Sequence, residues 1–202
     1  MTDDAAPAID TVRKLDSPPA KEIAAYSEVF DDLQTVLRCC EWLVAALVET
    51  SDAPPAETDL LIEATWTTAL LSYGRCFAVR QYASLTEADL TTTQPEGDVD
   101  SWHQILLALR DHYAHPTINP RETFSVGAAQ GDDGTADGIA LSSAHRPAVD
   151  LLTVRQTGAI AYGLSALVDQ RIGEQEKALL EDVRVRTREE LDTLDVLELV
   201  SS

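Results

Sequence analysis

Six polar side chains lie close together between Trp102 and Pro116 of this 202-residue chain. They are His103, Arg110, Asp111, His112, Tyr113 and His115, and they include three of the four histidines. Arginine carries a permanent charge that can bind a phosphate through two hydrogen bonds at once, and histidine can transfer a proton near neutral pH. The pair Arg110 and His115 therefore has the minimum chemistry for cleaving an RNA phosphodiester without a metal, since one group stabilises charge on the phosphorus oxygens and the other moves the proton of a ribose hydroxyl.

The spacing of these two residues sets a geometric condition. Five residues along an ideal helix correspond to a rotation of about 140°, so the two side chains would diverge if the helix continued past His115. Pro116 disfavours a helical conformation for the residue before it. We therefore expect the helix to end before His115, as convergence on Arg110 requires.

Other catalytic constellations fit this sequence less well. His112 and His115 can share one helix face, but His103 points to roughly the opposite side, and no HExxH motif occurs. We therefore expect no metal site, and without a P-loop or GxGxxG motif we expect no cofactor. Ser72 is not part of a G-x-S-x-G motif and Cys76 lies in an apolar helix, which argues against a serine or cysteine hydrolase.

The segment Arg110-Asp111-His112-Tyr113-Ala114-His115 resembles the signature of the HEPN superfamily, in which an arginine and a polar residue precede a histidine. Asp111 stands where that family most often has asparagine. A second segment, residues 70–77, resembles bacterial proteins with HEPN-like bundles. The motif covers a small part of the chain, and the helical pattern around it is consistent with the family.

The resemblance implies a fold, an activity and partners. HEPN proteins are helical bundles, and many are metal-independent endoribonucleases that act as toxins or in defence against phage. They work as homodimers in which the arginine and the histidine of both protomers line one cleft. By this resemblance Arg110 would stabilise the phosphate, His115 would act as general acid and base, and Asp111 would orient one of them. Other members are inactive binding or dimerisation modules, so the alternative is a non-catalytic module with a protein partner such as an antitoxin or a regulator.

The residues of the motif also have structural interpretations. Arg110 could simply pair with Asp111 or with another carboxylate on an acidic surface. His115 could interact with the dipole at the end of the helix. His112 could be an exposed surface residue without a role in a site.

Two further residues are candidates for supporting roles. His103 follows Trp102 in an apolar helix, where a core histidine with a hydrogen-bond partner is the structural interpretation. Arg75 also lies on an apolar helix, where a buried charge needs a partner. We expect it either to form a buried pair with Asp111 or another carboxylate, or to contribute to the site.

The formal net charge is −20, from 35 acidic and 15 basic residues. Such a charge repels nucleic acid and anionic lipid at long range, so any contact with RNA would have to be local. The acidity makes the non-catalytic module more credible. An acidic mimic of nucleic acid is a third hypothesis.

The cysteines and the apolar runs indicate the compartment. Cys39, Cys40 and Cys76 do not form a disulfide framework, and we interpret them as small buried residues of a reducing compartment. The longest apolar run, residues 42–48, is too short to span a bilayer, and the acidic N-terminus lacks a signal pattern. We expect a cytoplasmic protein with no membrane partner.

Hydrophobic spacing predicts the elements that position the motif. Apolar residues at intervals of three and four predict helices over 21–49, 57–80, 98–114 and from about 148 onward. The helix over 57–80 is apolar around most of its circumference, so we expect it to be the central one. Two short alternating runs predict a β-hairpin within about 121–145, which must lean on the helices because an isolated hairpin is marginal.

The expected architecture is an all-α fold in the main, an antiparallel four-helix bundle with the hairpin inserted before the last long helix. A disordered arm over 1–19 precedes the bundle domain, which spans 20–173. Residues 84–97 are expected to form a loop with one short turn. A charged helical extension over 174–202 either caps the bundle or pairs with a second chain.

Overall fold

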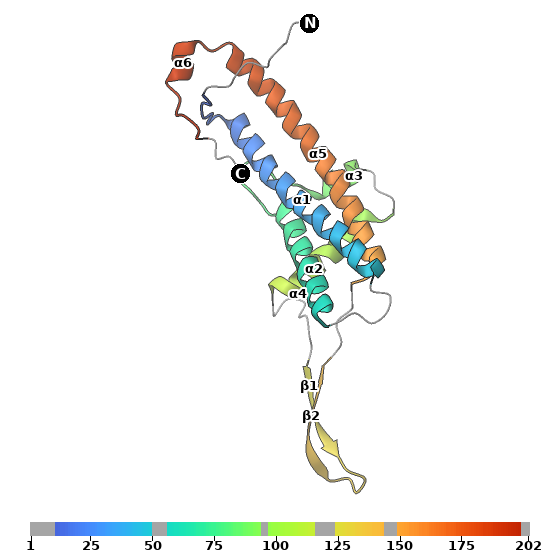
Figure 1. Ribbon diagram of the computed structural model, residues 1–202. Helices are drawn as coiled ribbons and strands as arrows, with labels where there is room; N and C mark the ends of the chain where they lie inside the picture. The colour runs from blue at the N-terminus through green and yellow to red at the C-terminus, as the bar shows by residue number, and fades with distance from the viewer. Residues whose placement is uncertain (1–10, 50–55, 94–96, 116–123, 144–148, 199–202) are drawn as a thin grey trace.

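The computed structural model describes residues 11–49, 56–93, 97–115, 124–143 and 149–198. Within these ranges the chain is mainly helical, and a two-stranded antiparallel hairpin precedes the long final helix, which confirms the expected fold class (Figure 1). The elements are α1 Pro18–Glu49, α2 Ala56–Cys76, α3 Glu87–Thr92, α4 Val99–Ala114, β1 Phe124–Gln130, β2 Ala136–Ser143, α5 Leu151–Arg184 and α6 Arg188–Asp192. No described helix is both long and apolar enough to cross a membrane.

The two long helices, α1 and α5, lie side by side and run in opposite directions (Figure 1). Buried residues of α1 recur at alternating intervals of four and three, namely Val29, Leu33, Val36, Cys40 and Leu43. Those of α5 recur at three and four, namely Val154, Thr157, Ala161, Leu164 and Val168. This spacing keeps each set on one side of its helix, so the two stripes form a continuous seam.

The expectation that α2 is a well-buried helix is confirmed, but α2 is not the one central helix. Helix α1 packs against both α5 and α2, and α2 likewise packs between α1 and α4. One side of α2 therefore remains open, and its Leu60, Leu61 and Leu71 are 65%, 55% and 39% exposed. The apolar circumference of α2 thus predicts its burial between two helices, but not which of its sides stays exposed.

Two helix boundaries differ from the sequence pattern for physical reasons. Helix α1 begins at Pro18, inside the expected arm, because proline is tolerated in a first turn whose amide groups have no helical partner. Helix α2 ends at Cys76 and not at residue 80. The carbonyl of Cys76 accepts a hydrogen bond from the amide of Leu85 at 3.0 Å, so the chain folds back there.

The two ends of the described chain meet. Residues 1–10 of the expected arm lie outside the described residues, but Arg13 forms a β-bridge with Val196 and donates to the Asp192 carboxylate at 2.8 Å. The amide of Leu197 also donates to the carbonyl of Val12 at 2.8 Å. Residues 12–14, which belong to the expected arm, are therefore held by the segment around Val196. The boundary expected at 173/174 falls inside the unbroken helix α5.

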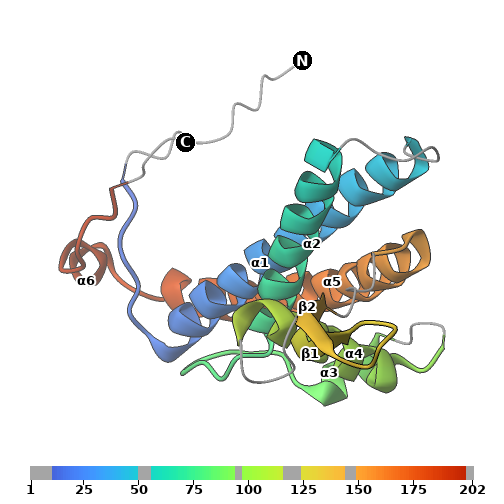
Figure 2. The same ribbon diagram turned by 90° about the horizontal axis from the view of Figure 1, so that it is seen from below.

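The expected short turn in residues 84–97 is helix α3, which lies beside α4 (Figure 2). Leu85 and Leu90 are buried there, and Asp89 is only 6% exposed. Asp89 accepts from the backbone and the hydroxyl of Thr86 and forms an ion pair with Arg171 of α5. Burial alone would raise the pKa of Asp89, but the bonds from Arg171 and Thr86 outweigh it and lower that pKa.

The hairpin is present as expected, but it does not lean on the helices. Its two strands pair with each other, from Phe124 opposite Ser143 to Gln130 opposite Ala136. All of its strand residues are exposed, and it extends away from the helical body (Figure 1). The expectation that the helices cover its apolar residues is wrong.

Because Asp89 forms an ion pair with Arg171, we expect substitution of this one carboxylate to have a large effect on stability. We expect Asp89→Ala to lower the free energy of unfolding by about 2 kcal/mol, because it leaves a partly buried guanidinium without its partner. Urea denaturation at neutral pH measures this loss. Because the folded pKa is lowered, the contribution is present above about pH 4 and is lost as the pH falls further.

The control is Asp98→Ala, which removes the exposed N-cap of α4 and no ion pair. We expect it to cost less than Asp89→Ala. If the two variants lose the same free energy of unfolding, the ion pair with Arg171 contributes nothing beyond what an N-cap such as Asp98 contributes.

Candidate functional site

Helix α4 ends immediately before His115, as the sequence predicts. Asp98 caps its beginning by accepting from the Ser101 amide, and the last helical residue is Ala114. His115 has extended backbone angles, φ −135° and ψ 108°, while its amide still donates to the Asp111 carbonyl at 3.0 Å. The His115 side chain is exposed. The structure thus provides an accessible imidazole at the end of a rigid element.

Arg110 forms an ion pair with the residue that follows it. Its Nε and Nη2 donate to Oδ1 of Asp111 at 2.9 and 2.6 Å. The two side chains are 30% and 20% exposed, so the pair is partly buried. A guanidinium has five N–H donors, and the carboxylate takes two of them. Asp111 thus contacts Arg110, which is compatible with an orienting role of Asp111 and with a purely structural pair.

Gly74 of α2 provides the surface on which Arg110 lies. A Cβ atom built at Gly74 would be 2.6 Å from Cδ and 3.2 Å from Nη1 of Arg110. Any larger residue would therefore displace the arginine side chain. The sequence analysis did not single out Gly74 as a site residue, although a glycine inside an apolar helix is a known signal of close packing.

His103 belongs to the core and not to the end of α4. It is 2% exposed, its Nδ1 lies 2.8 Å from the hydroxyl of Tyr73, and its ring centroid lies 4.4 Å from that of Phe77. Burial lowers the pKa of His103, and the charges of Glu87 and Asp100 oppose this only in part. His103 is therefore a core histidine with a hydrogen-bond partner.

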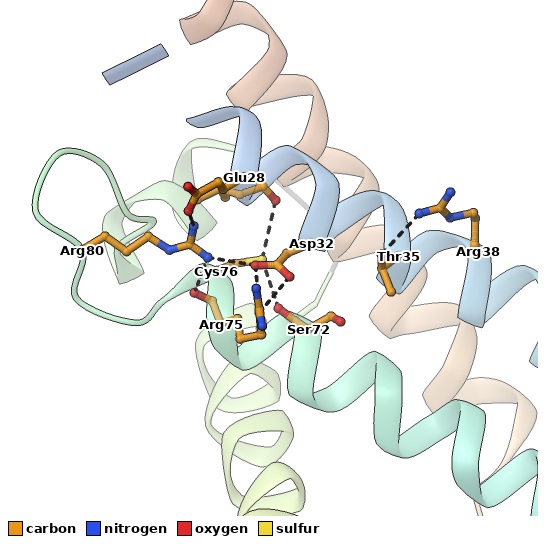
Figure 3. A network of polar contacts seen from close by, with 9 residues as sticks. Glu28, Asp32, Thr35, Arg38, Ser72, Arg75, Cys76 and Arg80 are labelled. Atoms are coloured by element: carbon orange, nitrogen blue, oxygen red, sulfur yellow. Dashed lines mark hydrogen bonds and ion pairs between the residues drawn. The ribbon is translucent and has the colours of Figure 1, made fainter. Parts of the chain in front are cut away.

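Arg75 is part of a second cluster, on the α1 side of α2. Figure 3 shows Asp32 of α1 between Arg75 and Arg80. Nε of Arg75 lies 2.9 Å from Oδ1 of Asp32, and Nη2 of Arg80 lies 2.8 Å from Oδ2. Arg80 also donates to the exposed Glu28 at 2.8 Å. The partner of Arg75 is thus Asp32 and not Asp111.

The exposure of this cluster corrects the expectation of a buried pair. The Asp32 side chain is 11% exposed, but the Arg75 side chain is 68% exposed. Asp32 is the buried member, and two arginines neutralise it from the surface. The cluster joins α1 to the end of α2 and keeps Arg75 apart from Arg110.

The remaining candidates are unsuited to nucleophilic or metal chemistry. Burial raises the pKa of the Cys76 and Cys40 thiols to about 12, so both are protonated at neutral pH. His112 is half-buried. Among the described residues, no three His, Cys, Asp or Glu side chains gather closely enough to hold a metal ion.

An open pocket of about 310 Å³ lies between α3 and α4. It is lined by Glu87, Ala88, Thr91, Asp100, His103 and Gln104. Its acidic rim does not favour an anion. Neither Arg110 nor His115 contributes to it, so the candidate site is the end of α4 itself.

His103 predicts a pH dependence of stability. Because its folded pKa is lowered, the unfolded chain binds a proton more readily once the pH falls below about 6.5. The free energy of unfolding should therefore be constant above about pH 7 and decrease between pH 6.5 and 5. Urea denaturation across this range measures the slope.

His103→Gln removes the titrating group and should flatten this slope. Tyr73→Phe removes the hydrogen-bond partner but keeps the imidazole, and should retain the slope. A slope in His103→Gln equal to that of the unmodified chain would assign the titration to another group.

Comparison of the chain with protein-family models, with curated proteins and with solved structures finds no match.

Proposed function

We propose that this chain is a HEPN-like, metal-independent endoribonuclease that acts through Arg110 and His115, in a defence or toxin–antitoxin context. The observation that supports the proposal most directly is the end of α4. Arg110 is held against Gly74 by its contact with Asp111, and His115 is the first residue beyond the helix, extended and exposed. A fixed cation and an accessible proton carrier are the two parts that the reaction needs.

In the proposed reaction His115 accepts the proton of a ribose 2′-hydroxyl while that oxygen attacks the phosphorus. The bond between phosphorus and the 5′ oxygen breaks, which leaves a 2′,3′-cyclic phosphate. The 5′ oxygen takes its proton from the protonated His115 of a second copy, in the homodimer that the HEPN resemblance implies. Arg110 stabilises the charge on the non-bridging oxygens with the donors that Asp111 does not take.

A non-catalytic interaction module is the second candidate function. The observation that favours it is that the Arg110 guanidinium already has a carboxylate partner. A phosphate would have to approach this pair in a chain whose net charge is −20. In this alternative Arg110 and Asp111 stabilise the last turn of α4, and a protein partner replaces the RNA substrate.

Removal of the imidazole is the direct test. We expect the purified chain to cleave tRNA, mRNA or rRNA in the presence of EDTA and to leave cyclic phosphate ends. His115→Ala should lower the rate by roughly 100-fold or more, because a general acid–base group contributes about that much. Arg110→Lys keeps the charge but loses the two-point contact, and should lower the rate by roughly tenfold or more.

Gel analysis of end-labelled RNA measures both rates. If the unmodified chain and His115→Ala act alike on all three kinds of RNA, the enzymatic proposal fails and the interaction module remains.

The close contact of Gly74 with Arg110 predicts that substitution of Gly74 lowers the cleavage rate by moving Arg110. This effect can be separated from an effect on folding. Gly74→Ala should displace Arg110 and lower the cleavage rate, because the added methyl group would lie only 2.6 Å from the Arg110 Cδ. The matched control is Gly173→Ala in α5, where an added Cβ meets no atom within 4 Å. Only the control should gain up to about 1 kcal/mol of unfolding free energy from the better helix propensity of alanine.

Urea denaturation and the RNA assay give the two readouts. Gly74→Ala with full activity and the same gain in stability as Gly173→Ala would contradict a role of Gly74 in placing Arg110.

A further inference from the structure

The pocket between α3 and α4 is walled mainly by groups that accept hydrogen bonds. Its rim carries Glu87 and Asp100, which lie in the first turns of α3 and α4. The Gln104 amide nitrogen donates to Glu87 at 3.0 Å, which leaves the Gln104 oxygen as an acceptor. The Thr91 hydroxyl donates to the Ala88 carbonyl at 2.8 Å and can likewise accept. No lysine or arginine is among the described residues that line the pocket, so its rim favours a ligand with a positive charge.

His103 is the buried member of this lining. It is only 2% exposed, whereas the other five lining residues are exposed. Its Nδ1 lies 2.8 Å from the Tyr73 hydroxyl, and no other described residue forms a hydrogen bond with the ring. The two ring nitrogens point in widely different directions, so Nε2 is directed away from Tyr73. Nε2 is therefore the polar atom that His103 offers to the pocket.

The Tyr73 hydroxyl determines which nitrogen of His103 carries the hydrogen. Tyr73 is fully buried, burial raises its pKa, and within the described part of the chain Nδ1 of His103 is its hydrogen-bond partner. If the hydroxyl accepted a hydrogen from Nδ1, its own hydrogen would be buried without an acceptor, which costs free energy. The hydroxyl therefore donates to Nδ1, and the neutral ring carries its hydrogen on Nε2. The pocket thus combines one buried N–H donor with an acidic rim.

The spacing of these groups favours a molecule over a metal ion. The charges of Glu87 and Asp100 oppose the effect of burial on the pKa of His103, so both lie within electrostatic reach of the ring. Yet no three His, Cys, Asp or Glu side chains of the described residues gather closely enough to hold one ion. The pocket of about 310 Å³ has room for several non-hydrogen atoms, since one water takes up about 30 Å³. A ligand that spans the groups needs a positive charge at one end and a hydrogen-bond acceptor at the other.

We propose that this pocket binds a small organic ammonium ion that carries a hydroxyl group. The ammonium group lies between Glu87 and Asp100 and donates to their carboxylates, and the hydroxyl oxygen accepts from Nε2 of His103. The net charge of −20 attracts such a cation at long range. This site does not depend on the proposed RNA cleavage, because neither Arg110 nor His115 lines the pocket.

The exposure of the rim sets the expected strength. Glu87 and Asp100 are both exposed, so solvent screens their attraction for the ammonium group. We therefore expect weak binding, with a dissociation constant of roughly 10 mM for a ligand of about four non-hydrogen atoms.

Three probes of equal size separate the two contacts. Ethanolamine has both the ammonium and the hydroxyl group, propylamine lacks the hydroxyl group, and propanol lacks the charge. Each is titrated into the full chain at constant ionic strength and slightly alkaline pH, and proton–nitrogen correlation spectra of the histidine rings follow Nε2 of His103. Ethanolamine should shift this resonance to saturation, whereas propylamine should bind about fivefold and propanol about tenfold more weakly.

Variants of the rim locate the ammonium group. Glu87→Gln and Asp100→Asn each remove one charge and keep the shape of the side chain. Each should raise the dissociation constant of ethanolamine about threefold, and the double variant about tenfold. The matched control is Glu189→Gln, which removes a carboxylate from the first turn of α6, outside the pocket, and should leave the dissociation constant unchanged. Circular dichroism should show the same helix content in all of these proteins.

Five outcomes would overturn the proposal. Equal affinities for ethanolamine and propylamine would indicate a general attraction of cations to an acidic chain. The absence of a saturable shift at about tenfold the expected dissociation constant would exclude the site. A spectrum with the hydrogen on Nδ1 of His103 would remove the donor to the hydroxyl group. Full affinity in the double variant would place the ligand elsewhere, and displacement of ethanolamine by lower concentrations of Mg²⁺ would assign the pocket to a metal ion.

Discussion

The rest of the helical body depends on the apolar seam between α1 and α5. Helix α1 contributes Val29, Leu33 and Val36 to this seam and also packs against α2. Every other described helix of more than six residues is placed directly or indirectly by α1, since α2 lies on α1 and α4 lies on α2. Loss of this seam would remove the support of the candidate site, although no residue of the site belongs to it.

Helix α2 transmits this support to the end of α4. Consecutive residues of α2 face different neighbours because they are about 100° apart on the helix. Arg75 contacts Asp32 on α1, while Gly74 faces the Arg110 side chain on α4. The α1–α2 cluster therefore holds α2 at its C-terminal end, next to the glycine on which Arg110 lies. The position of a candidate phosphate-binding group is in this way coupled to an ion pair on another helix.

Paired arginines are a recurring device in this acidic chain. Arg80 contacts Asp32, Arg171 contacts Asp89, Arg13 contacts Asp192 and Arg110 contacts Asp111. Each of these pairs joins two segments except the last, which joins neighbouring residues of one helix. Of these four arginines, Arg110 is therefore the one whose ion pair contributes little to joining segments of the chain.

The sequence by itself determined the existence of the long helices, the hairpin and the end of α4. These features follow from local rules, namely the spacing of apolar residues, the cap at Asp98 and the effect of Pro116 on His115. The sequence also placed Arg110 beside a carboxylate, because Asp111 follows it directly. Only the tertiary structure decided that α2 lies between α1 and α4, that Arg75 contacts Asp32, that Gly74 packs against Arg110 and that the hairpin stands free. These are contacts between residues far apart in the chain, or the absence of such contacts within the described residues. Periodicity reports which side of an element is apolar, but it carries no information on which neighbour, if any, covers that side.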